Sequence, residues 1–176
     1  MNKFYLVLLS TLLLLLTACA SVTKDIQVDA KTDPKANLSG YKTYTWLGSA
    51  AILNDPEKKW HPPEIQVSDE IKFLIDRELR NKGIILADAS EADLAIVFFL
   101  GIDMAAMKLK KDPGTNEELL TNVPEGGLIV ALIDAESGFV VWLGVAVADY
   151  KAGQYTETEV RQRLDYAISR MFSLYQ

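Results

Sequence analysis

The fold is decided by the stretch from Gly127 to Asp149, which reads GLIVALIDAESGFVVWLGVAVAD. Two apolar runs flank the segment Asp134 to Gly138, which is typical of a hairpin connection with Gly138 at positive φ. We interpret Asp134 as a turn residue that accepts hydrogen bonds from nearby backbone N–H groups. Both runs are too apolar for a hairpin with one solvated face, so each face of this hairpin needs cover.

The hairpin has two faces because side chains alternate along a strand. We expect Trp142 to lie on the face that meets the helices. The opposite face contains only apolar residues, and we name it as a candidate partner surface: Ile129, Ala131, Ile133, Val141, Leu143, Val145 and Val147.

Two helices are predicted. Within residues 64–83, apolar residues from Val67 to Leu79 recur at helical spacing, and Gly83 is placed to end the helix in a left-handed conformation. Thr156 and Glu159 form a capping box for a last helix with one apolar stripe from Val160 to Tyr175. One stripe per helix means one buried side, so both helices should lie on a sheet.

The remaining strands are predicted at 22–28, 41–46, 84–86 and 94–100, with loops at 54–63 and 112–126. The sequence therefore predicts an α+β fold. We expect a largely antiparallel (mixed) sheet of about five to six strands with two helices packed on one face.

The first residues predict secretion. Lys3 is followed by an apolar run, Phe4 to Leu16, which is too short to span a membrane but fits a signal peptide. Leu16-Thr17-Ala18-Cys19 resembles a bacterial lipobox. The expected organisation is a signal peptide at 1–18, a lipidated N-terminus and short tether at 19–21, and a single domain at 22–176.

The lipobox resemblance implies covalent diacylglycerol and an N-acyl chain on Cys19. Two or more acyl chains hold a protein stably at a membrane. Ala20 stands where an inner-membrane retention signal of enteric bacteria would have Asp. For a Gram-negative source we expect the periplasmic face of the outer membrane.

The composition excludes several functions. The formal net charge of −6 argues against binding to nucleic acid, and the single cysteine allows no intrachain disulfide. His61 is the only histidine, so neither a metal site nor a common catalytic triad is expected. We expect no enzyme, no metal and no cofactor beyond the lipid. Asp103 with Asp134 is the pair of carboxylates that a hydrolase would use.

Several motifs together resemble one family. The segment Leu38 to Trp46, LSGYKTYTW, is similar to the "FSGYKTYAW" signature of bacterial lipoproteins in the domain of unknown function 4136 family. Further motifs follow in order: Lys82-Gly83-Ile84, Glu91-Ala92-Asp93-Leu94 and Val141-Trp142-Leu143-Gly144-Val145-Ala146. The resemblance implies an envelope lipoprotein with a small α+β domain and supplies no catalytic residue. Members of the family usually have Arg where this chain has Leu143, and often a polar residue at Val145.

The leading hypothesis is a membrane-anchored, non-catalytic envelope module that binds a protein partner, itself or a lipid surface. Two helices cover only one sheet face, so the other face is either an exposed interaction patch or covered by residues 102–126 or 46–63. A periplasmic carrier of a small ligand or lipid is the alternative. It would show a deep apolar cavity between the helices and the sheet.

Overall fold

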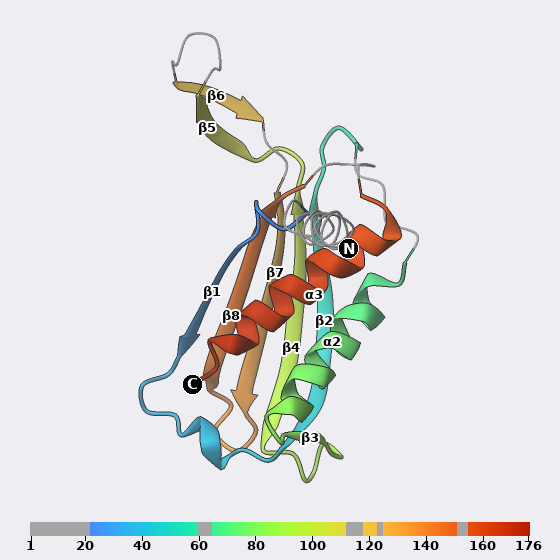
Figure 1. Cartoon of the computed structure of the whole chain (residues 1–176). Coiled ribbons are helices and arrows are strands. Elements are labelled where there is room, and N and C mark those ends of the chain that lie inside the picture. The colour runs from blue at the N-terminus through green and yellow to red at the C-terminus, as the bar shows by residue number, and fades with distance from the viewer. Residues whose placement is uncertain (1–21, 60–64, 112–117, 123–124, 151–154) are drawn as a thin grey trace, which may run out of the picture.

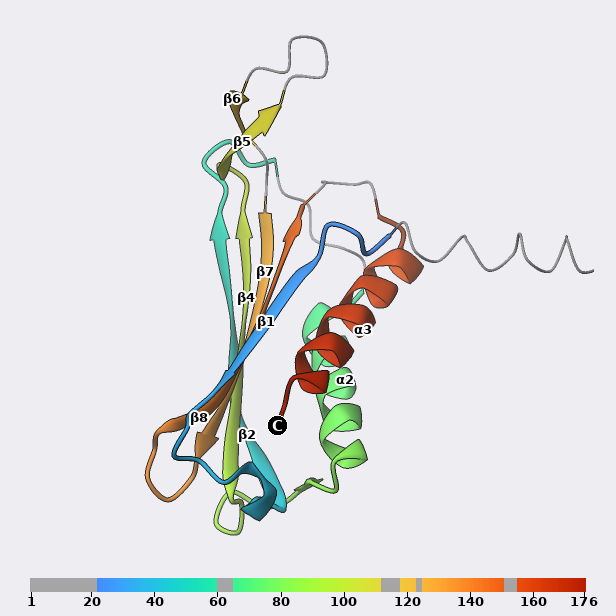
Figure 2. The ribbon, with the colours of Figure 1, turned by 60° about the vertical axis from the view of Figure 1, so that its left-hand side comes forward.

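The computed structural model describes residues 22–59, 65–111, 118–122, 125–150 and 155–176. They form a sheet of six strands in the order β1-β8-β7-β4-β2-β3, and both long helices lie on one of its faces (Figure 1, Figure 2). Strand β2 runs parallel to β3 and β4, and the other pairs of this sheet are antiparallel. The predicted α+β fold is confirmed.

The described elements are two long helices, one 3-10 turn, the six strands of the main sheet and a separate two-stranded hairpin. The helices are α2 (Val67–Asn81) and α3 (Glu157–Ser173), and a single 3-10 turn, η2, spans Leu38–Gly40. A separate hairpin, β5 (Met107–Lys111) with β6 (Glu118–Asn122), projects beyond one end of the sheet (Figure 1). The sheet strands are β1 (Gln27–Thr32), β2 (Thr43–Asn54), β3 (Ile85–Leu86), β4 (Leu94–Asp103), β7 (Glu125–Asp134) and β8 (Val140–Asp149).

The β7–β8 hairpin lies inside the sheet, between β4 and β1. Gly138 has a φ of 73°, and the Asp134 carboxylate accepts hydrogen bonds from the backbone N–H and the hydroxyl of Ser137 at 2.7 and 2.6 Å. A carboxylate that ties down its own turn in this way fixes the register of the strands. The predicted hairpin and the role of Asp134 are confirmed.

Both helix ends follow the predicted capping pattern. Gly83 has a φ of 79°, and the N–H of Ile84 donates to the carbonyl of Leu79 at 3.0 Å, which closes α2 as a Schellman motif does. At the start of α3, Thr156 and Glu159 exchange the two hydrogen bonds of a capping box.

The core lies between the helices and the sheet. Its largest side chains, Trp142, Phe98 and Phe172, are almost completely buried, and the rings of Trp142 and Phe172 are 5.0 Å apart between centroids. Gly144 lets α3 approach β8, because a Cβ there would lie 2.8 Å from the sulfur of Met171. These residues pack α3 closely against β8 in the layer where a carrier would need its cavity.

Three local expectations are wrong. The first strand, β1, spans Gln27–Thr32 instead of 22–28, because its pairing with β8 begins only at Gln27. Strand β2 continues to Asn54 instead of ending at Trp46, and β6 occupies 118–122, where a surface loop was expected. Residues 47–51, LGSAA, show no alternation because their strand lies at the side of the sheet, where neither parity is buried deeply. Long-range pairing with β4 extends β2 beyond Trp46, whereas β6 pairs with the nearby β5 in a local hairpin.

Candidate functional site

The sheet face opposite the helices carries the candidate surface. Directly opposed residues of paired strands project to the same face, so the register assigns each side chain. Ile129 is opposite Val145 and Ala131 is opposite Leu143, while Val147 is opposite Gly127. The sheet therefore brings the predicted residues of β7 and β8 together, and Ile133 extends the same parity along β7.

Two further strands widen this face, and sequence reasoning did not include them. Phe99 of β4 is opposite Ile129, and Val97 is opposite Ala131. Ala50 of β2 is in turn opposite Phe99. The run at 94–100 is apolar at both parities, so alternation alone could not assign its sides. We call the following set the open face: Ala50, Ile52, Val97, Phe99, Ile129, Ala131, Ile133, Leu143, Val145 and Val147.

No described segment covers the open face. Figure 2 views the sheet nearly edge-on, with α2 and α3 on one side and no described element on the other. Ile129 is 38% exposed and Ile52 is 62% exposed, whereas Ala131 is only 5% exposed among its neighbours. Of the segments that might have covered this face, β2 is part of the sheet itself and β5–β6 projects past its end (Figure 1).

Val141 is the exception among the predicted surface residues. The register shifts between Leu132 and Ile133, so that Trp142 is opposite Leu132 and Val140 is opposite Ile133. Val141 is the extra residue of this bulge, which breaks the alternation on which its assignment rested. It is buried and belongs to the core cluster, so we remove it from the candidate surface.

Polar residues border the open face on two sides. Strand β1 places Asp29 opposite Val145 and Lys31 opposite Leu143 at one edge. At the end of the sheet, Glu125 is opposite Asp103, whose carboxylate accepts a hydrogen bond from the Asn54 amide at 2.9 Å. An apolar centre with a polar rim is the usual anatomy of a protein interface.

A shallow hollow opens at the acidic end of the open face. Its volume is about 280 Å³, and it is lined by Ile52, Gly101, Gly127 and Val147 together with Asn54, Asp103 and Glu125. Ile52 pairs with Gly101, and Gly127 pairs with Val147. The hollow therefore exists because two glycines lie side by side between two larger residues.

The carboxylates considered for catalysis do not come together. Asp134 is opposite Leu94, the first residue of β4, and Asp103 is the last residue of that strand. At about 3.3 Å per residue the two lie roughly 30 Å apart. The hydrogen bonds from Ser137 hold the pKa of Asp134 below its usual value. Within the described residues, no three His, Cys, Asp or Glu side chains are grouped as metal ligands.

The residues of the family signature hold neighbouring elements together through hydrogen bonds. We call Tyr41, Lys42, Thr43, Asp93 and Asp134 the clasp. The carboxylate of Asp93 accepts the backbone N–H groups of Lys42 and Thr43 at 2.7 and 2.9 Å, which lowers its pKa. The Tyr41 hydroxyl donates to Asp134 at 3.0 Å, and burial together with this bond raises the pKa of Tyr41 to about 12. The signature thus ties the start of β2 to the starts of β4 and of the β7–β8 turn.

Asp76 of α2 completes this clasp from the helix side. Its carboxylate accepts hydrogen bonds from the Tyr44 hydroxyl and from Trp46 Nε1, the latter at 3.2 Å. Sequence analysis identified Tyr44 and Trp46 as part of the family signature but missed their partner, Asp76. An acidic residue on the polar face of a helix is ordinarily solvated. The sequence around Asp76 therefore does not indicate that it accepts hydrogen bonds from Tyr44 and Trp46.

Cys19, the predicted lipidation site, and His61, which was not expected to be functional, lie outside the described residues. None of the described helices is long and apolar enough to cross a membrane. Because Cys19 lies outside the described residues, its lipidation stays a prediction.

Several solved structures are similar to this chain at low sequence identity. A DUF4136 family protein from Bacteroides thetaiotaomicron is 16% identical with a TM-score of 0.54, and the match covers 86% of this chain and 96% of that one. The PelC dodecamer from Paraburkholderia phytofirmans is 14% identical with a TM-score of 0.44, covering 84% and 95%. Lipoprotein GNA1162 from Neisseria meningitidis is 8% identical with a TM-score of 0.38, covering 74% and 98%. The first likeness shows the fold alone, and the other two are too weak to support an inference.

A comparison with curated proteins found no match. The model of the family described as "Domain of unknown function (DUF4136)" matches residues 28–175, from the second residue of β1 to the end of α3 and just beyond. This match spans the sheet, both helices and every motif of the clasp. The chain therefore belongs to the DUF4136 family.

Proposed function

We propose that this protein is a non-catalytic module of the bacterial envelope that binds a protein partner through the open face. The observation that carries the proposal is the uncovered apolar side of β2, β4, β7 and β8, opposite the helices (Figure 2). Monomeric soluble proteins rarely leave a large contiguous apolar patch in water, and such patches mark interaction sites.

Membrane attachment is the second part of the proposal. A lipid on Cys19 would hold the domain close to the bilayer, because the first strand begins only eight residues later in the sequence, at Gln27. The lipobox and Ala20 favour the periplasmic face of the outer membrane. There the open face would meet other envelope proteins.

The rim narrows the chemistry of the partner. Asp103 and Glu125 border one end of the open face, and Asp29 and Lys31 border its β1 edge. A complementary partner would bring an apolar centre flanked by basic groups at the acidic end. Rim charges of this kind mainly set orientation and association rate.

In-cell photo-crosslinking tests the proposal. A photo-reactive amino acid is placed in the full chain at Leu143 or Ile129, and trapped species are identified by mass spectrometry. The matched control is Tyr166 of α3, which is 41% exposed against 38% for Ile129. We expect one specific envelope protein at both open-face positions and not at Tyr166. Equal capture at all three, or no specific adduct at either open-face position, would count against the proposal.

A further inference from the structure

The outer edge of β2 is unpaired over most of its length. On one side β2 pairs with β4 from Tyr44 to Asn54, whereas on the other side β3 pairs only with Thr43 and Tyr44. Residues 46–54, WLGSAAILN, therefore meet no described strand on that side. We call this segment the free edge of β2, and it faces away from the rest of the sheet (Figure 1).

The hydrogen bonds of β2 show which backbone groups point away from the sheet along the free edge. The carbonyl of Asn54 accepts from the N–H of Met104 at 2.8 Å, so Asn54 is turned towards β4. Backbone N–H and C=O groups of successive strand residues point to opposite sides. Those of Ser49, Ala51 and Leu53 consequently point outward, where they can bond to another strand.

The two edges of the sheet differ in protection. At the β1 edge, the Asp29 carboxylate accepts the backbone N–H of Ala30 at 2.9 Å, and Lys31 adds a charge. Charges and occupied N–H groups are how natural proteins keep strand edges from pairing. The free edge of β2 has neither charge nor proline, and its Leu47 and Ile52 are 66% and 62% exposed.

We propose that the free edge of β2 pairs with the same edge of a second copy of this chain, antiparallel and centred on Ala51. In this register Ser49 of one copy is opposite Leu53 of the other, and Ala51 is opposite Ala51. All three outward residues of each copy are then used, because they are spaced symmetrically about Ala51. No charge within either segment opposes the pairing.

This pairing closes after two copies. A two-fold contact consumes each β2 edge once, and the protected β1 edges remain at the outside. The two-fold axis is perpendicular to the sheet, so both open faces lie on the same side and join into one surface. The inference concerns the edge of the sheet and not its face, so it stands independently of the proposed partner.

Cysteine crosslinking in cell envelopes tests the inference. In the full chain, Ala51→Cys would place two thiols on opposed residues about 5.5 Å apart between Cα atoms, which suits a disulfide. The only native cysteine, Cys19, is present in every variant and serves as the background. Mild oxidation should give a species of twice the monomer mass. The same substitution at Ala30 on the β1 edge should give none.

A second set of variants separates specific pairing from collision. Added to Ala51→Cys, Ser49→Pro removes one outward N–H and should reduce the crosslinked dimer at least tenfold, whereas Ala30→Pro should leave it unchanged. If Ser49→Pro lowers the melting temperature, Leu53→Lys gives the same test by charge without altering the backbone. The inference is overturned by absence of the dimer in a normally folded Ala51→Cys protein, by equal yields at Ala30, or by an adduct with a different protein. Each of these results leaves the Leu143 crosslinks unaffected, so the proposed function is judged separately.

Discussion

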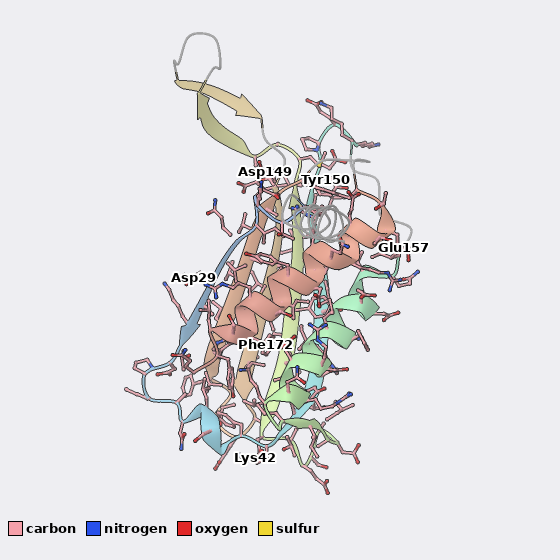
Figure 3. The ribbon with its side chains drawn as sticks, viewed as in Figure 1. Asp29, Lys42, Asp149, Tyr150, Glu157 and Phe172 are labelled. Atoms are coloured by element: carbon pink, nitrogen blue, oxygen red, sulfur yellow. The ribbon has the colours of Figure 1, made fainter. Side chains whose placement is uncertain are left out.

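The two faces of the sheet are made by neighbouring residues of the same strand, yet their environments differ completely. On β8, Trp142 and Ala146 pack against the helices, while Leu143 and Val145 project to the open face. Both sets are apolar, so hydropathy cannot tell them apart. Phe172 of α3, labelled in Figure 3, packs its ring against Trp142 on the covered side of the sheet, with 5.0 Å between the ring centroids. An apolar strand residue is therefore buried only when another element lies on its face of the sheet.

The largest difference is expected from removing one ring. Trp142→Ala should lower the free energy of unfolding by about 3–5 kcal/mol, because it leaves a cavity against Phe172 and Tyr175. Leu143→Ala, one residue further along, should cost about 1 kcal/mol. Urea unfolding followed by circular dichroism measures both. Similar losses for the two variants would break the distinction between the faces.

The next largest difference in stability between the two faces is expected from adding one methyl group at a glycine. In Gly144→Ala the new Cβ would lie 2.5 Å from the Trp142 ring and 2.8 Å from the sulfur of Met171, so overpacking should cost about 1–3 kcal/mol. Gly127→Ala on the open face meets no atom closer than 3.8 Å. It should be neutral or slightly stabilising, since glycine is unfavourable within a strand. Thermal unfolding of the pair gives the comparison, and a destabilised Gly127→Ala would contradict it.

The stability of the fold should also depend on pH, through an ion pair between α3 and the segment before β1. Arg163 of α3 binds both carboxylate oxygens of Asp25 at 2.8 and 2.6 Å, and this bond lowers the pKa of Asp25. A carboxylate with a lowered pKa stabilises the fold above its unfolded value of about 3.9 and loses that stabilisation as the pH falls through the folded value. Asp25→Asn should therefore cost about 1–2 kcal/mol at pH 7 and progressively less below pH 4.

Arg163→Gln provides the control for this ion pair. It should cost at least as much at pH 7 as Asp25→Asn, because Arg163 also donates to the carbonyl of Val22. The double variant should be no less stable than Arg163→Gln, since that substitution already removes the ion pair. Additive losses would show that the two residues act separately. Tyr155 lies under the Arg163 guanidinium, 4.4 Å from its centre, and should be monitored by fluorescence for any local rearrangement.

The smallest effect on stability is expected from Leu143→Arg. The change introduces on the open face the residue that the family resemblance implies at this position, and the free energy of unfolding should move by less than about 0.5 kcal/mol. Binding of an apolar dye to the open face and capture of the proposed partner should both fall. Unchanged partner capture would show that the open face is not the binding surface.

Local sequence was enough for much of this fold. The hairpin turn with Gly138, the end of α2 at Gly83 and the capping box of α3 each depend on a few adjacent residues, and each is confirmed. The candidate surface was predicted on β7 and β8, apart from Val141. A bulge between two strands removed that residue, and no local pattern announces such a bulge.

Features that depend on contacts between distant residues were not predicted from the sequence. The full length of β2 depends on parallel pairing with β4, about fifty residues further along the chain. The contributions of Phe99 and Ala50 to the open face follow from the same pairing. The clasp residue Asp76 became visible only when α2 was placed over Tyr44 and Trp46.

The sequence by itself determined the family, the helices, the hairpin and the alternation of β7 and β8, because these depend on neighbouring residues and on their periodicity. The side that both helices cover was predicted from the alternation around Trp142. Tertiary structure alone decided the strand order, the parts of the apolar face that β2 and β4 add, and the strand edge that is left free. These features arise from pairing and packing between distant segments, whose cost and gain no local stretch of sequence contains.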